Sequence, residues 1–346
     1  MIYRLVLLFG IVAFVAGCLP DKGTQEVYKI AGNTMGTTYN ISWVDTEDRS
    51  FDIKNRVDHR LREINAAMST YISNSELSQI NRSDDINFRV SSDLAEVLSI
   101  SLSIYRASHG LFDVTIGPLV NLWGFGPDAK VERQPSNEQI SLQLDRVGSD
   151  ALKLQALTLE RSEYRYIDLS AVAKGWGVDQ IAELYEDYGI DNYLVEIGGE
   201  MRLSGNKPSN IPWRIAIERP SGDLQQRSPQ LIFSPGARAV ATSGDYRNYF
   251  ELDGVRYSHT IDVKTGKPIS HRLASVSVIH ERSAYADAWA TALNVAGPEA
   301  GLLLAEQNNL AAYMIVREEN GFKEYFSNQF RAWFPEVVSQ SEIQDR

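Results

Sequence analysis

An acidic and a hydroxyl side chain stand four residues apart in an alanine-rich segment of this sequence. Asp287 and Thr291 lie within residues 284–293, whose composition predicts a helix, so both side chains should project from one face, one turn apart. A carboxylate and a hydroxyl are hard oxygen donors of the kind that Mg2+ prefers, and Mg2+ often completes its shell with water or substrate phosphate. The alternative interpretation is a solvated Asp beside a Thr that bonds back to a helix carbonyl.

A run of small residues containing one lysine leads into a second predicted helix. The run extends over residues 168–175. Its backbone can approach a ligand closely, Lys174 can neutralise a phosphate, and the start of a helix favours anions. The same residues could instead form a helix cap, in which Asp168 or Ser170 holds the first amides and Lys174 lies in solvent. Both interpretations remain open at this point.

One histidine lies in a segment that alternates like a strand. Alternation over residues 256–262 places His259 on one face with Tyr257 and Ile261. Imidazole can accept a proton from an attacking hydroxyl near neutral pH, so His259 is a candidate general base. A hydrogen-bonded core histidine among apolar neighbours is the alternative.

The size and charge of the chain limit the class of protein. Its 346 residues suffice for one large domain or two modest ones, and 43% of them are hydrophobic, as in ordinary globular proteins. The formal net charge of -11 argues against nucleic acid or anionic lipid as a main electrostatic partner, because such binding needs clustered Lys and Arg. Binding of a diphosphate would therefore need a cation at the site.

The N-terminal segment has the pattern of a bacterial lipoprotein leader. Arg4 provides a positive start, and residues 5–15 form an apolar run too short to span a bilayer comfortably. Small residues then precede Cys18, the single cysteine of the chain, as in a lipobox. We therefore expect residues 1–17 to be a signal peptide and residues 18–27 to be a lipidated cysteine with its tether. This predicts a lipid-anchored protein on the periplasmic side of the inner or outer membrane, with a free buried thiol as the alternative.

Helices and strands are expected in mixed order along the chain. Apolar periodicity predicts helices at residues 53–68, 94–105, 178–189 and 283–295 and around 302–304. β-Branched and aromatic segments predict strands at residues 34–44, 192–197, 213–217, 239–243, 256–262, 274–279, 311–316 and 322–326. A long surface connection is expected at residues 124–138, and tight turns at residues 198–199, 243–247 and 264–268.

The order of these elements favours an α+β fold. Strands of the second half follow one another without regular strand–helix alternation, which predicts mostly antiparallel sheets with packed helices, either in one body or in two lobes with the site between them. We expect the folded domain to cover residues 28–335, followed by a tail at residues 336–346. The sequence contains neither a Gly-x-Gly-x-x-Gly motif after a strand nor a Walker-type phosphate loop.

Several sequence blocks, taken together and in this order, resemble the ApbE family of FAD:protein FMN transferases. The resemblance covers about residues 30–316. It rests on Thr34-Met35-Gly36-Thr37, Met68-Ser69-Thr70-Tyr71, Ser75-Glu76-Leu77-Ser78, Gly110-Leu111-Phe112-Asp113-Val114-Thr115, Gly117-Pro118-Leu119-Val120, Trp123-Gly124-Phe125-Gly126, residues 168–175, Gly198-Gly199, Ala241-Thr242-Ser243-Gly244-Asp245-Tyr246, residues 257–262 and residues 286–293.

The resemblance implies a set of ligand contacts. The residues that it places at FAD are Met35, Tyr71, Phe112, Asp113, Val114, Asp168, Lys174, His259 and Ile261. It places Mg2+ between the side chains of Asp287 and Thr291 and backbone oxygens at Ala171 and Ala284. It also implies an acceptor Thr or Ser in a subunit of a membrane redox pump, such as the Na+-translocating NADH dehydrogenase (Nqr) or an Rnf-type complex.

The implied reaction agrees with the chemistry of these side chains. An acceptor hydroxyl attacks the FMN-side phosphorus of FAD and AMP departs, so the negative charge on the diphosphate oxygens must be offset. A bound Mg2+ offsets that charge. His259 is the first candidate for the base that removes the hydroxyl proton, and Asp168 or Asp287 is the second.

Two other functions would use the same site. Water in place of the acceptor hydroxyl would make the protein an FAD pyrophosphatase that yields FMN and AMP. A protein without chemistry would be an FAD-binding lipoprotein that stores or delivers the dinucleotide. A magnesium site at the diphosphate favours an enzyme, because a carrier gains little by weakening a phosphate linkage.

Overall fold

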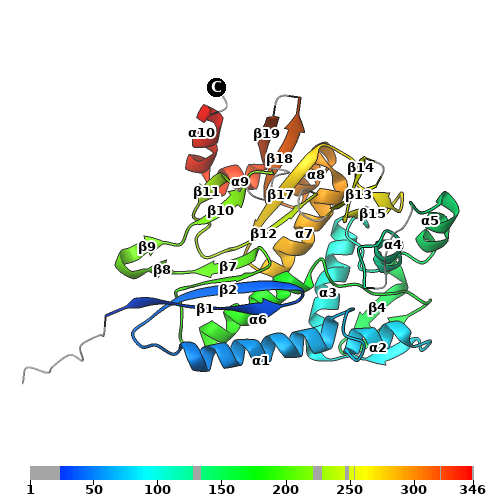
Figure 1. Cartoon of the computed structure of the whole chain (residues 1–346), viewed down its shortest axis with the longest axis horizontal. Coiled ribbons are helices and arrows are strands. Elements are labelled where there is room, and N and C mark those ends of the chain that lie inside the picture. The colour runs from blue at the N-terminus through cyan, green and yellow to red at the C-terminus, as the bar shows by residue number, and fades with distance from the viewer. Residues whose placement is uncertain are drawn as a thin grey trace, which may run out of the picture.

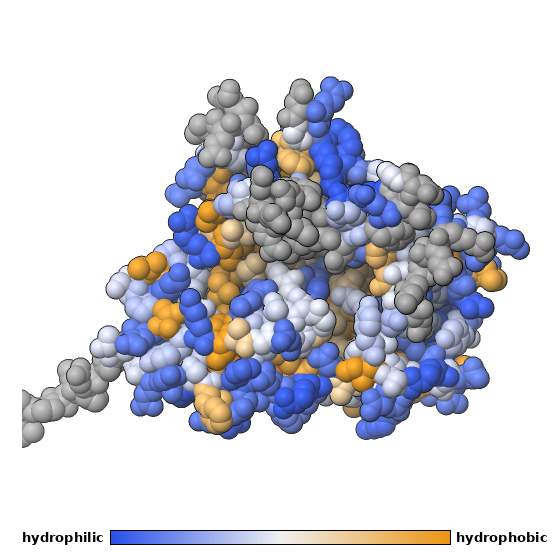
Figure 2. Space-filling model, in the orientation of Figure 1, coloured by the Kyte–Doolittle hydropathy of each residue, from blue (hydrophilic) through white to orange (hydrophobic). Residues whose placement is uncertain are grey.

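The computed structural model describes residues 24–127, 134–220, 228–245, 249–252, 254–319 and 321–344. The expected signal peptide, Cys18 and most of the tether lie outside these ranges. Within them, no helix combines the length and the hydropathy needed to cross a bilayer. Figure 2 shows hydrophilic residues over most of the face in view, with apolar residues in smaller groups between them.

An eight-stranded antiparallel sheet runs through the molecule (Figure 1). Its strand order is β1-β2-β6-β7-β12-β17-β18-β19, and every neighbouring pair is antiparallel. The strands are β1 (Glu26–Thr34), β2 (Thr37–Asp45), β6 (Tyr193–Ile197), β7 (Glu200–Ser204), β12 (Ala239–Gly244), β17 (Leu273–His280), β18 (Ala311–Glu318) and β19 (Gly321–Phe326). The expected α+β class with antiparallel sheet is confirmed.

Helices cover both faces of this sheet. One face carries α1 (Ser50–Met68), α3 (Ser92–Ala107), α6 (Ala173–Asp187), α7 (Ser283–Ala296) and α8 (Pro298–Gln307). The other face carries α9 (Asn328–Trp333), α10 (Pro335–Gln344), β10 (Ile215–Glu218) and β11 (Pro229–Phe233). Strand β18 alternates between the two cores, with Met314 in the first and Tyr313 in the second, which explains its uninterrupted apolar sequence.

A smaller group of elements adjoins the main sheet, on the right of Figure 1. It contains α2 (Glu76–Arg82), α4 (Gly117–Leu122), α5 (Asn137–Leu144), β3 (Asn87–Arg89), β4 (Leu152–Gln155) and β5 (Thr158–Arg161). One apolar cluster joins Leu77 and Leu159 of this group to Tyr39 of the main sheet. Helix α2 and strand β5 thus belong to the same core as the main sheet, whereas Leu119 of α4 and Ile140 of α5 pack in a separate small cluster. Short hairpins complete the fold: β8 (Asn206–Lys207) with β9 (Ile211–Pro212), β13 (Tyr249–Leu252) with β14 (Val255–Ser258), and β15 (Ile261–Asp262) with β16 (Lys267–Pro268).

The strand predicted for residues 34–44 is wrong at its start, because a hairpin turn lies there. Thr34 pairs with Thr37, and the two residues between them have positive φ, 48° at Met35 and 72° at Gly36. Positive φ at both central residues is the geometry of a type I′ turn, which joins twisted antiparallel strands well. A methionine in this conformation is uncommon, and such backbone strain is concentrated at functional sites.

The single strand predicted for residues 256–262 is also wrong. The Ser258 hydroxyl accepts a bond from the amide of Thr260 at 3.1 Å, and the chain bends at His259 between β14 and β15. A side chain that bonds its own backbone in this way competes with the strand ladder. Strand alternation therefore does not determine the direction of His259.

Other boundaries also differ from the sequence predictions. The connection expected at residues 124–138 ends earlier, because the Ser136 side chain caps α5; its residues 128–133 lie outside the described ranges. Helix α6 begins at Ala173 instead of 178, although Gly189 closes it with φ 70° as expected. The turn expected from 243 does not begin there, since Ser243 and the next residue still belong to β12.

Candidate active site

Lys174 lies between two buried carboxylates. Its Nζ is 3.0 Å from Glu200 Oε1 and 3.6 Å from Asp287 Oδ2. Glu200 and Asp287 are each 4% exposed, and the Lys174 side chain is 28% exposed. The alternatives with a solvated Asp and a solvent-exposed lysine are therefore wrong, since both groups belong to one internal ionic cluster.

The electrostatics of this cluster favour a bound cation. Burial raises the pKa of Glu200 to about 7, against the opposing effect of Lys174. Burial also raises the pKa of Asp287. Burial alone would lower the pKa of Lys174, but the charges of Asp287 and Glu200 outweigh this effect and raise it. Glu200 Oε2 has no hydrogen-bond partner among the described residues. A second positive charge here would stabilise the ionised carboxylates.

A glycine on α6 allows α7 to approach this cluster. The Gly175 amide donates to Asp287 Oδ2 at 2.9 Å. A Cβ at Gly175 would lie 2.4 Å from the backbone oxygen of Ser283, closer than atoms can pack. Only glycine therefore permits this contact between the helices, and the contact fixes the Asp287 carboxylate beside Lys174.

Thr291 follows Asp287 by one turn of α7, as the spacing predicts. Its hydroxyl is 3.3 Å from Ser243 Oγ at the end of β12. The sequence reasoning missed Glu200 and did not single out the Ser243 hydroxyl. The available signals were the position of Glu200 directly after the tight turn Gly198-Gly199, and the hydroxyl of Ser243 next to a glycine at a strand end.

The donor set fits Mg2+. Asp287 supplies carboxylate oxygen, Thr291 supplies hydroxyl oxygen, and Ala284 lies in the first turn of the same helix. Across the described ranges, no group of three or more His, Cys, Asp or Glu could hold a metal ion. A site for a thiolate- or imidazole-binding metal is therefore not seen there, whereas Mg2+ needs one or two carboxylates plus phosphate and water.

The segment before α6 does not cap this helix with a side chain. Asp168 Oδ1 accepts bonds from the Ser170 amide at 2.9 Å and the Ser170 hydroxyl at 2.5 Å. Val172 occupies the N-cap position of α6 and makes no side-chain cap bond within the described part of the chain. The predicted cap by Asp168 or Ser170 is therefore wrong for α6, whose Ala173 and Gly175 amides donate to the Leu169 oxygen and to Asp287.

Met35 contacts α6 near the ionic cluster. Its Cε lies 3.0 Å from the position that a Cβ on Gly177 would take, and Lys174 Cδ lies 3.3 Å from the corresponding position at Gly198. An open pocket of about 420 Å³ is lined by residues 33–38 of the β1–β2 turn. The strained turn thus places Met35 at the wall of an accessible pocket beside α6.

Tyr71 and His259 both lie next to Phe125, and Asp168 lies near Tyr71. The Tyr71 hydroxyl donates to the Phe125 oxygen at 3.4 Å, and the ring of half-buried His259 meets the Phe125 ring edge-on at 6.3 Å between centroids. Partial burial raises the pKa of Tyr71, and the nearby charge of Asp168 adds to this. The Thr260 hydroxyl accepts a bond from the Asn294 side chain of α7 at 3.3 Å, which ties the His259 segment to the helix that carries Asp287.

The remaining predicted FAD contacts have buried side chains. Phe112 and Val114 belong to the main core, and Ile261 packs in a small cluster with Trp123. The Asp113 carboxylate accepts bonds from the amides and hydroxyls of Thr115 and Ser149. Their roles as FAD contacts stay predictions.

Replacing Tyr71 with alanine should weaken FAD binding about ten-fold, as expected for loss of one stacking side chain. Tyr71 is 66% exposed, so the thermal unfolding midpoint should change little. Titration of FAD fluorescence measures the affinity. Phe51→Ala is the control, because Phe51 is also exposed but lies on α1. Equal FAD affinity of the Tyr71 variant and the wild type would contradict the flavin contact.

Comparisons with known proteins agree on one family. The model of the ApbE family matches residues 35–314. An FAD:protein FMN transferase of Vibrio cholerae is 46% identical over 321 residues, which cover 92% of this chain and 95% of the relative. That of Haemophilus influenzae is 41% identical over 340 residues, which cover 94% of this chain and 97% of the relative. Among solved structures, a flavin transferase ApbE from Vibrio cholerae has a TM-score of 0.82 at 44% identity, covering 89% of this chain and 99% of its own. The apo form of a Pseudomonas stutzeri flavinyl transferase ApbE has a TM-score of 0.83 at 38% identity, and the match covers 90% of this chain and 97% of that structure.

Proposed function

The chain belongs to the ApbE family, and on that premise we propose that it transfers the FMN half of FAD to a Thr or Ser hydroxyl of an acceptor protein in an Mg2+-dependent reaction. The observation that carries the magnesium requirement is the buried Asp287 carboxylate beside Lys174, with Thr291 one turn further along the same helix. The chain supplies few metal ligands, which leaves room for the oxygens of a diphosphate.

In the transfer, the acceptor oxygen bonds to the FMN-side phosphorus while the bond to the AMP phosphate oxygen breaks. The departing AMP takes the bonding electron pair, and the hydroxyl proton passes to a base. Lys174 offsets negative charge on the diphosphate. Bound Mg2+ supplies further charge neutralisation at the phosphate oxygens.

His259 is the first candidate for the base. It is half-buried, contacts Phe125, and lies in a segment that Thr260 ties to α7. Asp168 is the second candidate, because its second carboxylate oxygen is not used by Ser170. Asp287 suits metal binding better, since its carboxylate already accepts the Gly175 amide and pairs with Lys174.

The partner and the cellular location are further parts of the proposal. An acceptor subunit of an Nqr- or Rnf-type redox pump would present its free Thr or Ser hydroxyl near a membrane, and a lipid anchor on Cys18 would keep this chain at the same surface. Incorporation of labelled fatty acid into the full chain, and its loss in Cys18→Ala, tests the anchor. Labelling that survives this substitution would contradict it.

One assay distinguishes FMN transfer from FAD hydrolysis and from FAD binding without chemistry. The purified chain is incubated with FAD, Mg2+ and a candidate acceptor, with EDTA in a parallel sample. We expect covalent flavin on the acceptor and free AMP with Mg2+, and neither with EDTA. Free FMN plus AMP without labelled acceptor would support the pyrophosphatase, and intact FAD would support a carrier.

A further inference from the structure

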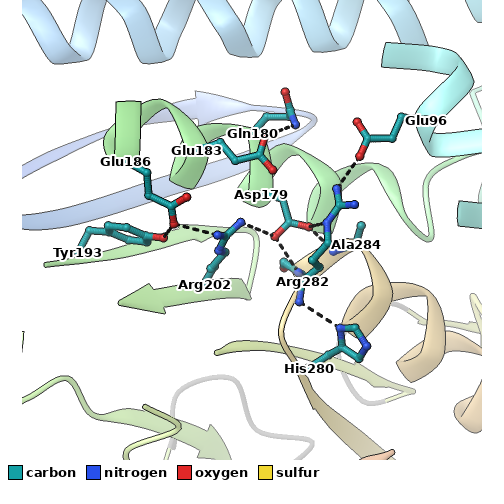
Figure 3. A network of polar contacts seen from close by, with 11 residues as sticks. Glu96, Asp179, Gln180, Glu183, Glu186, Tyr193, Arg202, His280, Arg282 and Ala284 are labelled. Carbon is teal, nitrogen blue, oxygen red and sulfur yellow. Dashed lines mark hydrogen bonds and ion pairs between the residues drawn. The ribbon is translucent and has the colours of Figure 1, made fainter. Parts of the chain in front are cut away.

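Asp179 caps α7 from a neighbouring helix. Its side chain is 0% exposed, and its carboxylate accepts bonds from the amides of Ser283 at 2.8 Å and Ala284 at 3.0 Å (Figure 3). These amides belong to the first turn of α7, whose own N-cap residue Arg282 makes no side-chain cap bond in the described part of the chain. Asp179 of α6 therefore satisfies helix amides that α7 does not satisfy itself.

Two arginines make burial of this carboxylate possible. Arg202 of β7 lies 3.4 Å from one Asp179 oxygen, and Arg282 lies 3.6 Å from the other. Each arginine also holds a second carboxylate, Glu186 at 2.8 Å and Glu96 at 2.7 Å (Figure 3). Burial raises the pKa of Asp179, and the two amides and both arginines act against this rise. A buried charge needs such complete partnering, because a single missing partner is costly.

The bonds of Asp179 to α7 and the bond between Gly175 and Asp287 together join α6 to α7. On α6, Gly175 and Asp179 are four residues apart, and their partners on α7, Asp287 and Ser283, have the same spacing in the opposite order. The two helices are thus held in antiparallel contact at two points, one turn apart on each helix. Ala284 and Asp287, both expected at the metal, lie at these two points.

We infer that Asp179 is a positioning residue for the magnesium site, which holds the first turn of α7 where Asp287 and the Ala284 carbonyl can reach an ion beside Lys174. The inference rests on the proposed function and deepens it. Asp179 acts through the α7 backbone, so its loss should weaken the metal site without removing a reacting group. Loss of groups that orient metal ligands typically costs about 10–100-fold in metal affinity.

The test compares Asp179→Asn with wild type in the otherwise intact chain. Asparagine keeps the size of the side chain but replaces one acceptor oxygen with a donor that faces a helix amide. Mn2+ binding, followed by the electron paramagnetic resonance of free Mn2+, should weaken at least about 10-fold. The Mg2+ concentration for half-maximal flavin transfer should rise by a similar factor, while saturating Mg2+ restores the rate to within about three-fold of wild type.

Glu183→Gln is the matched control. Glu183 lies one turn after Asp179 on α6, and the charges of the same two arginines act on it. Its carboxylate, however, accepts a bond from the Gln180 side chain of its own helix. This variant should bind Mn2+ like the wild type. A folded Asp179→Asn variant with wild-type Mn2+ affinity would overturn the inference, as would a rate loss that saturating Mg2+ does not restore.

A second variant covers the case in which Asp179→Asn does not fold. Arg282→Gln removes one partner of Asp179 from a side chain that is 33% exposed, and it should weaken Mn2+ binding about three-fold. Unchanged Mn2+ binding in this folded variant would also overturn the inference. Failure of the proposed function has a different signature, since wild type would then bind Mn2+ and yet form no covalent flavin at any Mg2+ concentration.

Discussion

Replacing Asp287 with asparagine should reduce covalent flavin transfer at least about 100-fold, while the chain remains folded. Asparagine keeps an acceptor oxygen for the Gly175 amide, but it removes the charge that faces Lys174 and the ion. Flavin fluorescence of the acceptor after denaturing electrophoresis measures the transfer, and circular dichroism during heating measures the fold.

The control for this variant is Asp187→Asn, since Asp187 is an exposed aspartate at the end of α6. It should transfer flavin at the wild-type rate. If Asp287→Asn keeps full activity and the same Mg2+ dependence, Asp287 is not a metal ligand.

Replacing Gly175 with alanine should both destabilise the chain and abolish most transfer. The new Cβ would lie 2.4 Å from the Ser283 backbone oxygen and 2.7 Å from Asp287 Cβ, and neither atom can rotate away. The helices must separate, at a cost of about 1–3 kcal/mol. A shift of about 1 Å at the metal site is enough for a roughly 100-fold loss of rate. Thermal unfolding and the transfer assay measure the two effects.

Gly177→Ala on the same helix is the stability control for this prediction. Its Cβ would meet Met35 Cε at 3.0 Å, the far end of a flexible side chain that can move. We expect a much smaller change in the unfolding midpoint than for Gly175→Ala. Equal midpoints for the two variants would show that the contact between α6 and α7 is not tight.

Local periodicity predicted α7, the helix of the proposed magnesium site, well. Asp287 and Thr291 lie on one face of α7 because the apolar and alanine positions around them have helical spacing. Periodicity could not reveal that Glu200 and Ser243 approach this face, since these residues come from β7 and β12 and only sheet order brings them there. The same limit hid Asp179, whose partners are backbone amides of a distant helix.

Side-chain bonds to the local backbone explain the principal strand error. Ser258 bonds the amide of Thr260 and stops the strand at His259, although the residue types on either side favour β structure. Strand β1 was missed for another reason. It is an edge strand with mostly exposed residues, so polar side chains such as Lys29 interrupt the apolar alternation that would mark it.

The measurement that tests magnesium-dependent transfer most directly is the ratio of AMP released to flavin bound covalently to the acceptor. We expect intact mass of the acceptor and chromatography of the nucleotide to show one AMP per added FMN, and EDTA to abolish both products together. AMP released in large excess over bound flavin, or transfer that continues in EDTA, would contradict it.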